Sequence, residues 1–165
     1  MNLRPLNLKD APFMLEWMHE PSVTEGLQTD FMSKTIEDCE NFIQASLTDT
    51  KNLHLAIVDD NDEYLGTVSL KHIEDNTAEF AITIRKCAMG KGISKGAMIA
   101  MISKGLDELG LNSVYWCVSP DNARAVRFYD KNGYKRISAD QLVIAGDYTD
   151  EQKEKYFWYV ENKNE

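Results

Sequence analysis

Apolar residues recur at helical spacing in two segments near the amino terminus. The first segment, residues 8–20, is followed by Pro21, which interrupts the pattern. The second segment, residues 33–47, begins with Ser33 and Thr35, and either residue suits the N-cap of a helix. The apolar stripe of this segment consists of Ile36, Cys39, Phe42, Ile43 and Leu47. The pattern therefore predicts two amphipathic helices early in the chain.

Three strand-like runs follow. Residues 53–59 and 64–73 are rich in apolar and β-branched side chains, and the polar residues 60–63 between them predict a turn. Residues 78–84 alternate, so that Glu79 projects from the face opposite to the apolar one. The apolar face of that run carries Phe80, Ile82 and Ile84, and the other face carries Glu79, Ala81 and Thr83. Together the three runs predict a meander.

The next part of the chain has a strand–helix–strand–helix order. The strand 78–84 is followed by a helix over about residues 93–109, with Gly110 as its C-terminal glycine. Residues 113–119 then predict a strand, and residues 120–134 a short helix. That helix is capped near Asp121 or Asn122 and stopped by Gly133. Residues 134–138 and 155–162 predict two closing strands, separated by a polar excursion at 139–155. This order predicts an α+β fold with helices packed on a mixed sheet.

Length and composition indicate one globular domain spanning residues 1–165. The chain is 43% hydrophobic and 27% charged. No run approaches the roughly 18 apolar residues of a membrane span, and the amino-terminal residues do not resemble a signal peptide. Cys39, Cys87 and Cys117 are odd in number and widely spaced, so we expect neither a disulfide framework nor a metal site. The expected location is the cytoplasm.

The net charge of −9 is unevenly distributed. Residues 1–75 carry −10, residues 76–137 carry +5, and residues 138–165 carry −4. An acidic protein repels the phosphates of nucleic acid, so we expect no nucleic-acid partner. The uneven charge indicates a polyanion site in the basic block and a cation-attracting surface elsewhere, or it is a chance clustering of solvated charges.

A glycine-rich stretch, AMGKGISKGAM at residues 88–98, lies within the basic block at the entry to the helix 93–109. The first turn of a helix presents N–H groups without intrahelical partners, which can bind a phosphate. A Walker A loop is excluded because Lys95 or Ala97 stands where its second glycine belongs. A dinucleotide fingerprint fails in the same way, with Lys95 in place of its last glycine.

The longer pattern resembles the GNAT superfamily of N-acetyltransferases. The pyrophosphate loop of that superfamily, Arg/Gln-x-x-Gly-x-Gly/Ala, falls on Met89, Gly90, Lys91, Gly92, Ile93 and Ser94. Gly92 is retained at a defining position, and Gly90 is also frequent there, whereas Met89 and Ser94 depart from the pattern. The segment SPDNARAVRFYDKNGY matches a second motif of the superfamily through Asn122, Ala125, Tyr129, Gly133 and Tyr134.

This resemblance implies a mixed, mostly antiparallel sheet of about seven strands with splayed central strands, flanked by about four helices. It implies acetyl-CoA as cosubstrate and no metal. The backbone of Ile82, Thr83 and Ile84 would pair with the pantetheine arm. The loop from Met89 to Ser94 would hold the pyrophosphate, with side-chain charge from Lys91, Lys95 or Arg85. Asn122 would contact the cofactor near the splay, and Tyr129 would direct its hydroxyl at the thioester sulfur.

Acetyl transfer to an amine needs a base, because a primary amine with a pKa near 10.4 is mostly ammonium at pH 7. Glu79 is the candidate, since it is the one acid on its strand and related proteins place a Glu near the acceptor amine from this strand. An exposed glutamate without a role is the competing interpretation. Cys117 is rejected as a nucleophile, because it lies on an apolar strand with no histidine nearby in sequence.

The acceptor is less well defined by the sequence. Acidic residues in the regions that grip the acceptor in this superfamily favour a cationic amine, such as a polyamine, an aminoglycoside, an amino sugar or a protein N-terminus. Acidity that serves only solubility explains the same residues. The lead hypothesis is an acetyl-CoA-dependent N-acetyltransferase, and the alternative is a coenzyme-A-binding sensor or scaffold without turnover. A homodimer is compatible with the resemblance.

Overall fold

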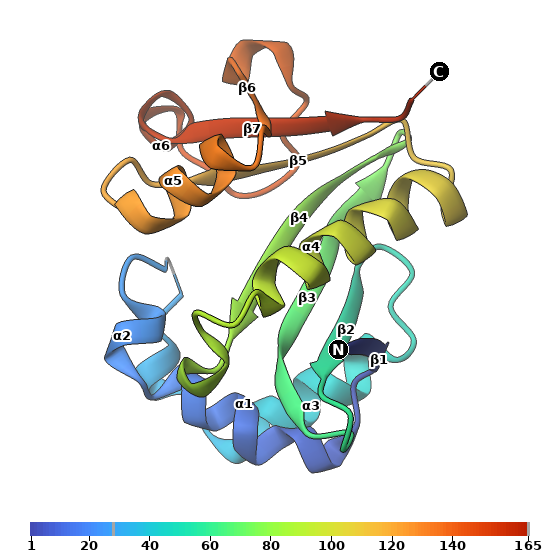
Figure 1. The fold of residues 1–165 in the computed structure, drawn as a ribbon, viewed down its shortest axis with the longest axis vertical. Coiled ribbons are helices and arrows are strands. Elements are labelled where there is room, and N and C mark those ends of the chain that lie inside the picture. The colour runs from blue at the N-terminus through green and yellow to red at the C-terminus, as the bar shows by residue number, and fades with distance from the viewer. Residues whose placement is uncertain (28, 165) are drawn as a thin grey trace.

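A seven-stranded sheet with the order β1-β2-β3-β4-β5-β7-β6 forms the centre of the computed structural model, which describes residues 1–27 and 29–164 (Figure 1). The strands are β1 (Asn2–Pro5), β2 (Leu53–Val58), β3 (Tyr64–Glu74), β4 (Thr77–Ile84), β5 (Ser113–Val118), β6 (Lys135–Ile137) and β7 (Phe157–Asn162). Neighbouring strands are antiparallel except β4 and β5, which are parallel. The predicted mixed, mostly antiparallel sheet is confirmed.

Helices cover both faces of the sheet. They are α1 (Ala11–Met18), α2 (Pro21–Thr24), α3 (Ile36–Ser46), α4 (Ile93–Ser103), α5 (Ala123–Lys131) and α6 (Asp150–Lys155). Side chains of α1 and α3 pack with Ala56, Val58 and Tyr64 in one core cluster. Side chains of α4 pack with Leu70 and Phe80 in another, on the opposite face. The short helices α2 and α6 add to the four helices that the periodicity predicts.

Local sequence explains where the longer helices begin and end. Thr35, not Ser33, is the N-cap of α3, because its side chain and that of Asp38 form a reciprocal capping box. Asn122 caps α5 by accepting a hydrogen bond from the N–H of Ala125 at 3.2 Å. Gly110 and Gly133 have φ of +70° and +78°, as expected for glycines that end helices.

Two parts of the chain differ from the prediction. Residues Asn2–Pro5 form the edge strand β1, which is too short to show alternation and contains a proline. The excursion 139–155 is ordered, with a 3-10 turn at Ala139–Gln141 and the helix α6. Leu142, Ile144 and Tyr148 of this excursion pack against a cluster formed by Tyr115, Trp158 and Val160. The excursion is therefore part of the core on one side of the sheet.

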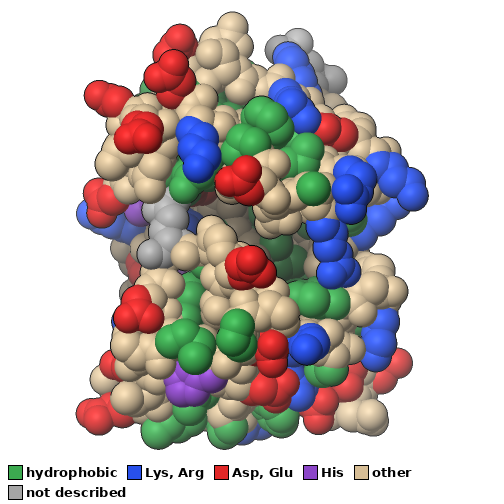
Figure 2. Space-filling view, turned by 90° about the vertical axis from the view of Figure 1, so that its left-hand side faces the viewer, with side chains coloured by type: hydrophobic (Ala, Val, Ile, Leu, Met, Phe, Trp, Pro, Cys, Tyr) green, Lys and Arg blue, Asp and Glu red, His purple; other side chains and the backbone are tan. Residues whose placement is uncertain are grey.

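The central parallel strands are paired over only part of their length. β4 and β5 share three aligned pairs, ending at Glu79 opposite Tyr115. β4 then runs on to Ile84 and β5 to Val118 without pairing to each other, and Figure 1 shows them diverging toward α2 and α5. The face that carries α2 and α5 is hollowed between its upper and lower parts, with hydrophobic side chains inside (Figure 2). The predicted splay of the central strands is confirmed.

Candidate active site

The glycine-rich loop presents a row of free backbone N–H groups. Gly90 and Gly92 both have φ of +76°, a left-handed conformation that favours glycine. Gly92 is the N-cap of α4, and within the described part of the chain no hydrogen bond is found from the backbone N–H groups of residues 90–95. A Cβ built on either glycine meets no described atom within 4 Å. The loop can therefore accept an anion against its backbone.

Basic side chains lie around this loop, but Arg85 is not free to join them. Its guanidinium donates hydrogen bonds to Glu16 at 3.0 Å and Glu63 at 3.1 Å, and only a small part of it is exposed. Arg85 therefore ties β4 to α1, and the suggestion that it supplies charge to the loop is wrong. Arg124 of α5 lies closer, with its guanidinium 3.9 Å from the sulfur of Met89. Lys91 is exposed on the loop itself.

One edge of β4 faces the gap between β4 and β5. The N–H of Arg85 donates to the carbonyl of Leu65 at 2.8 Å, so the backbone of Arg85 faces β3. Backbone groups alternate in direction along a strand, so Ile84 and Ile82 turn their N–H and C=O toward the gap. Thr83 pairs with Thr67 and directs its backbone to β3. Of the three residues predicted for pantetheine, Ile82 and Ile84 therefore offer backbone groups to the gap.

Glu79 lies at the last paired position before the strands separate. Glu79 is only 3% exposed, so it is not the exposed glutamate of the competing interpretation. Tyr148 donates a hydrogen bond to Oε2 of Glu79 at 2.6 Å. The other oxygen, Oε1, is buried and has no hydrogen-bond partner among the described residues. The nearest cation is the Nζ of Lys71 at 3.9 Å from Oε1, and the Nε2 of His72 lies 4.0 Å from the same oxygen.

An irregular turn of β3 places the side chains of Lys71 and His72 beside the same oxygen of Glu79. Successive residues of a regular strand point to opposite faces, yet Lys71 and His72 both approach the same oxygen of Glu79. The register between β3 and β4 shifts after Lys71, and His72 has φ of +53°. This bulge turns the side chain of His72 onto the face that carries Glu79.

Tyr148 is a residue of the site that the sequence analysis did not identify. It lies in the excursion 139–155, and the S–H of Cys117 donates to its oxygen at 3.4 Å. Burial raises the pKa of Tyr148 well above its usual range, so the phenol stays protonated and donates to Glu79. Burial also raises the pKa of the Cys117 thiol to about 11, which is consistent with its rejection as a nucleophile. No motif or periodicity around Tyr148 in this polar segment indicated that it belongs to the site.

Tyr129 and Asn122 lie on α5 and at its start, on the far side of the gap. The ring of Tyr129 packs against Trp116, Tyr134 and Tyr159, with centroids 5.7, 6.3 and 5.0 Å away. Burial raises the pKa of Tyr129 above its usual range, and its hydroxyl donates no hydrogen bond to any described residue. Asn122 uses its side-chain oxygen to cap α5, which leaves its amide nitrogen available to a ligand.

An apolar pocket of about 360 Å³ adjoins the open edge of β4. It lies on the face of the sheet that carries Glu79, between α1, α3 and the strands β2 to β4. Its lining consists of Met14, Trp17, Met18, Thr29, Phe31, Lys34, Asp38, Phe42, His54, Thr67, Ser69, Ala81, Ile82 and Thr83. Ala81, Ile82 and Thr83 lie on the part of β4 that is not paired with β5, so the pocket lies beside the gap.

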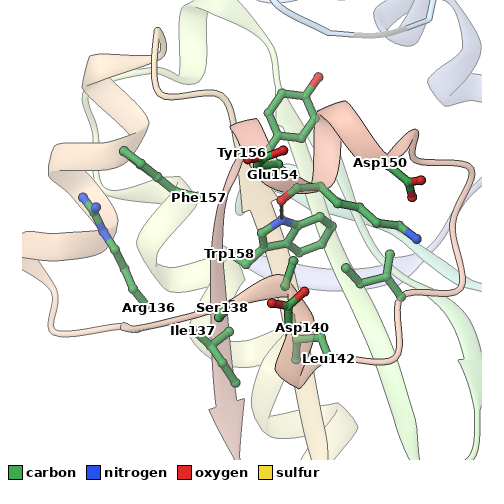
Figure 3. Close-up of a pocket in the computed structure, with 13 residues that line it drawn as sticks. Arg136, Ile137, Ser138, Asp140, Leu142, Asp150, Glu154, Tyr156, Phe157 and Trp158 are labelled. Atoms are coloured by element: carbon green, nitrogen blue, oxygen red, sulfur yellow. Dashed lines mark hydrogen bonds between the residues drawn. The ribbon is translucent and has the colours of Figure 1, made fainter.

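A second cavity, of about 670 Å³, lies between β6, β7, α6 and the 3-10 turn (Figure 3). Figure 3 shows the indole of Trp158 at its base, with its N–H donating to the carbonyl of Lys153 at 3.0 Å. None of its lining residues belongs to β4 or to the glycine-rich loop. This cavity is therefore separate from the space formed by the gap and the apolar pocket.

Two features are absent from the described part of the chain. Residues 1–27 and 29–164 contain no helix long and apolar enough to cross a membrane. The same residues contain no group of three or more His, Cys, Asp or Glu side chains arranged to hold a metal ion.

Comparison with known proteins connects the fold and site to a family. The family model described as an acetyltransferase (GNAT) domain matches residues 1–135. A curated relative, the uncharacterized N-acetyltransferase p20 of Bacillus licheniformis, is 26% identical over 141 residues, covering 82% of this chain and 79% of the relative.

Solved structures with the same fold include two of spermidine N-acetyltransferase from Vibrio cholerae. The complex with CoA and spermine has a TM-score of 0.80 at 18% identity, covering 98% of this chain and 95% of the other. A dodecameric form has a TM-score of 0.73 at 19% identity, covering 98% and 93%. The family match over most of the chain, the splayed strands and the glycine-rich loop agree, and the chain belongs to the GNAT family of N-acetyltransferases.

Proposed function

We propose that this protein transfers the acetyl group of acetyl-CoA to a primary amine, by direct attack in a ternary complex. The acceptor is an amine of a small molecule or of a protein N-terminus. The observation that carries the proposal is the row of unpaired N–H groups at residues 90–95, next to the unpaired edge of β4. A diphosphate and an extended amide chain need these two features side by side.

Binding of acetyl-CoA uses backbone groups first. The N–H groups from Gly90 to Ser94 hold the pyrophosphate, with Met89 at the start of the loop and Lys91 adding charge. These groups suffice although Met89 and Ser94 depart from the family pattern, because the backbone makes the contacts. Arg124 contributes a further positive charge from across the gap.

The pantetheine arm lies along the open edge of β4 in this proposal. The N–H and C=O groups of Ile82 and Ile84 pair with its amides as a strand would. The side chain of Thr83 lines the acceptor pocket instead. The amide nitrogen of Asn122 reaches the cofactor from the start of α5. The thioester then lies between β4 and Tyr129.

Glu79 acts as the general base, directly or through one water. Neutralising an alkyl ammonium at pH 7 costs about 4–5 kcal/mol, and a general base typically raises the reaction rate by a factor of about 10²–10⁴. One oxygen of Glu79 is held by Tyr148, and the other has no hydrogen-bond partner among the described residues, so it is free to receive the proton. Glu79 takes this first proton before the attack, and the neutral amine then forms the C–N bond with the thioester carbonyl carbon.

The negative charge that develops during transfer needs two further donors. A backbone N–H of β4, from Ile82 or Ile84, donates to the carbonyl oxygen as it becomes an oxyanion. Tyr129 donates its phenolic proton to the departing sulfur as the C–S bond breaks, and the phenolate regains a proton from the second N–H of the attacking nitrogen, directly or through water. The raised pKa of Tyr129 keeps this proton on the phenol until the thiolate forms.

A coenzyme-A-binding module without turnover is the alternative, since Met89 and Ser94 depart from the family loop. The experiment that separates the two is a steady-state analysis in which acetyl-CoA and a panel of amines are both varied. The proposal predicts acetylated amine as product and intersecting initial-velocity lines, because both substrates bind before transfer. Parallel lines would indicate an acetyl-enzyme intermediate and contradict direct attack. Tight acetyl-CoA binding without product from any amine would favour the binding module.

Assembly and location are also proposals. The family resemblance is compatible with a homodimer, and the structurally similar Vibrio cholerae enzyme has a dodecameric form, so we propose an oligomer in solution. Light scattering of the purified chain tests this expectation, and a monomeric mass contradicts it. Cys39, Cys87 and Cys117 are free thiols in the structure, which supports a reducing compartment such as the cytoplasm.

A further inference from the structure

We propose that His72 carries one proton per turnover from Glu79 to solvent. This inference rests on the proposed function, in which Glu79 takes a proton from the ammonium of the acceptor. A primary ammonium has three N–H bonds. One of these hydrogens stays in the amide product, and one ends on the thiol of coenzyme A. The third is left on Glu79, which must lose it before it can deprotonate the next acceptor.

The oxygen that receives this proton is buried. Oε2 of Glu79 already accepts the hydrogen bond from Tyr148, so the proton is received by Oε1. The side chain of Glu79 is 4% exposed, and Oε1 has no hydrogen-bond partner among the described residues. A Cβ on Gly146 would lie only 3.4 Å from this oxygen, so the excursion 139–155 covers it on one side. The products cover the side of the gap until they leave, and the proton therefore needs another way out.

Two neighbours of Glu79 do not provide that way. The hydrogen bonds from Cys117 to Tyr148 and from Tyr148 to Glu79 both run toward the carboxylate. Burial raises the pKa of the Cys117 thiol to about 11 and that of Tyr148 above its usual range, so both groups keep their own protons. The Nζ of Lys71 lies 3.9 Å from Oε1, but an ammonium has no lone pair to accept a proton.

The imidazole of His72 has the chemistry and the position for this step. A neutral imidazole has one acceptor nitrogen, and it takes up and releases protons near neutral pH. The Nε2 of His72 lies 4.0 Å from Oε1, so a movement of about 1 Å brings the two atoms within hydrogen-bond distance. The side chain is 39% exposed, so the same ring also contacts solvent. His72 therefore connects the buried carboxylate to water.

The backbone of β3 holds His72 in this position. Its φ of +53° is uncommon for a residue other than glycine, and the register with β4 shifts after Lys71. The N–H of His72 donates to Oδ1 of Asn52 at 2.9 Å, and the N–H of Ile73 donates to the carbonyl of Lys51 at 2.8 Å. The residues just before β2 therefore fix the bulge that directs the ring toward Glu79.

The proposed step breaks one O–H bond and forms one N–H bond. The Nε2 of neutral His72 takes the proton from Oε1, which restores the carboxylate of Glu79 and leaves an imidazolium. The ring then turns outward and gives the proton to water or to a buffer base. Without the imidazole, the proton leaves only when the segment over Glu79 opens. Local opening takes about a microsecond to a second, a range that includes the turnover times of ordinary enzymes.

His72→Gly tests the step by chemical rescue. Glycine adopts the positive φ of this position and leaves space for a free ring. With the amine that the wild-type protein acetylates fastest, we expect kcat to fall by about tenfold or more, while the KM for the amine and the affinity for acetyl-CoA stay unchanged. Added imidazole should restore kcat. Pyrazole, a ring of the same shape that is not protonated near neutral pH, should not. The acetylated amine is measured by mass spectrometry, and wild-type kcat should respond to neither compound.

His72→Asn is the second variant, because asparagine also tolerates positive φ but does not carry a proton at neutral pH. It should be as slow as His72→Gly. Wild-type kcat in either variant overturns the inference. Equal rescue by imidazole and pyrazole, or a loss that imidazole does not restore, assigns His72 a structural role and overturns it as well. A wild-type protein that binds acetyl-CoA but acetylates no amine removes the proposed function itself, and this inference with it.

Discussion

The hydroxyl of Tyr148 lies 2.6 Å from Oε2 of Glu79 and joins residues that are 69 positions apart in the sequence. Through this contact the segment between β6 and β7 covers Glu79 at the point where β4 and β5 separate. Gly146 packs closely against the same two side chains. A Cβ at this position would lie 3.0 Å from the ring of Tyr148 and 3.4 Å from Oε1 of Glu79. The proposed base is therefore held in place by a segment from the other half of the sheet.

Tyr148→Phe should lower kcat while leaving the affinity for acetyl-CoA unchanged. The substitution removes the donor that stabilises the ionised carboxylate of Glu79, and a buried acceptor left without its donor costs about 1–3 kcal/mol of stability. Steady-state kinetics and calorimetric titration with acetyl-CoA measure the two effects. Tyr134→Phe is the matched control, because that hydroxyl donates no hydrogen bond to a described residue. Wild-type kcat in Tyr148→Phe would remove Tyr148 from the mechanism.

Glu79→Gln should reduce activity most near neutral pH and least at high pH. The amine acceptor has a pKa near 10.4, so above that value it is already neutral and needs no base. The ratio of wild-type to variant kcat/KM should therefore shrink as the pH rises from about 7 toward 10. A uniform loss across this range would instead assign Glu79 to positioning the acceptor.

Tyr129→Phe should lower turnover with little change in cofactor binding. The ring keeps its contacts with Trp116 and Tyr159, and only the hydroxyl that protonates the leaving sulfur is lost. We expect a loss in kcat of about 10²–10⁴, the usual contribution of a general acid. Single-turnover measurements at saturating acetyl-CoA isolate this step. A variant that turns over at the wild-type rate shows that the sulfur leaves without help from Tyr129.

Gly92→Val should abolish acetyl-CoA binding. Its φ of +76° suits glycine and disfavours a β-branched residue, and the new side chain fills space in front of the free N–H groups. Gly96→Ala is the control, because Gly96 lies within α4 and its new Cβ would meet only the flexible end of Met1. Calorimetric titration with acetyl-CoA should show binding by Gly96→Ala alone. Unchanged affinity in Gly92→Val would refute the loop assignment.

His54 should make folding stability depend on pH. Burial lowers its pKa in the folded state below the unfolded value of about 6.5, so the unfolded chain binds more protons in this range. The free energy of unfolding is therefore highest above about pH 6.5 and falls as the pH drops through the folded pKa. Urea denaturation between about pH 5 and pH 7.5 measures this slope, and His54→Gln should reduce it. An equal slope in the variant would assign the dependence to other groups.

Much of the fold could be predicted from local patterns. The helix α3, the alternation of β4 and the glycines that end helices depend on signals within a few residues, and they appear where expected. Of the predicted stripe of α3, however, only Cys39 and Ile43 are buried. The glycine-rich loop was also predictable from local sequence, because positions with positive φ, such as 90 and 92, favour glycine.

The missing parts depend on contacts between distant residues. From the sequence alone Arg85 is a free cation near the loop. In the fold its guanidinium forms ion pairs with Glu16 and Glu63, which are distant in sequence. Tyr148 had no periodicity to mark it, because its position follows from packing against Trp158 and Cys117.

Release of coenzyme A thiol from acetyl-CoA, measured with and without each member of a panel of primary amines, tests the central claim most directly. The account predicts thiol release that depends on the amine, with a product in which an acetyl group replaces one N–H hydrogen, and no release by Gly92→Val. Bound acetyl-CoA with no amine-dependent thiol release across the whole amine panel would contradict it. That result would identify the chain as a binding module rather than a working acetyltransferase.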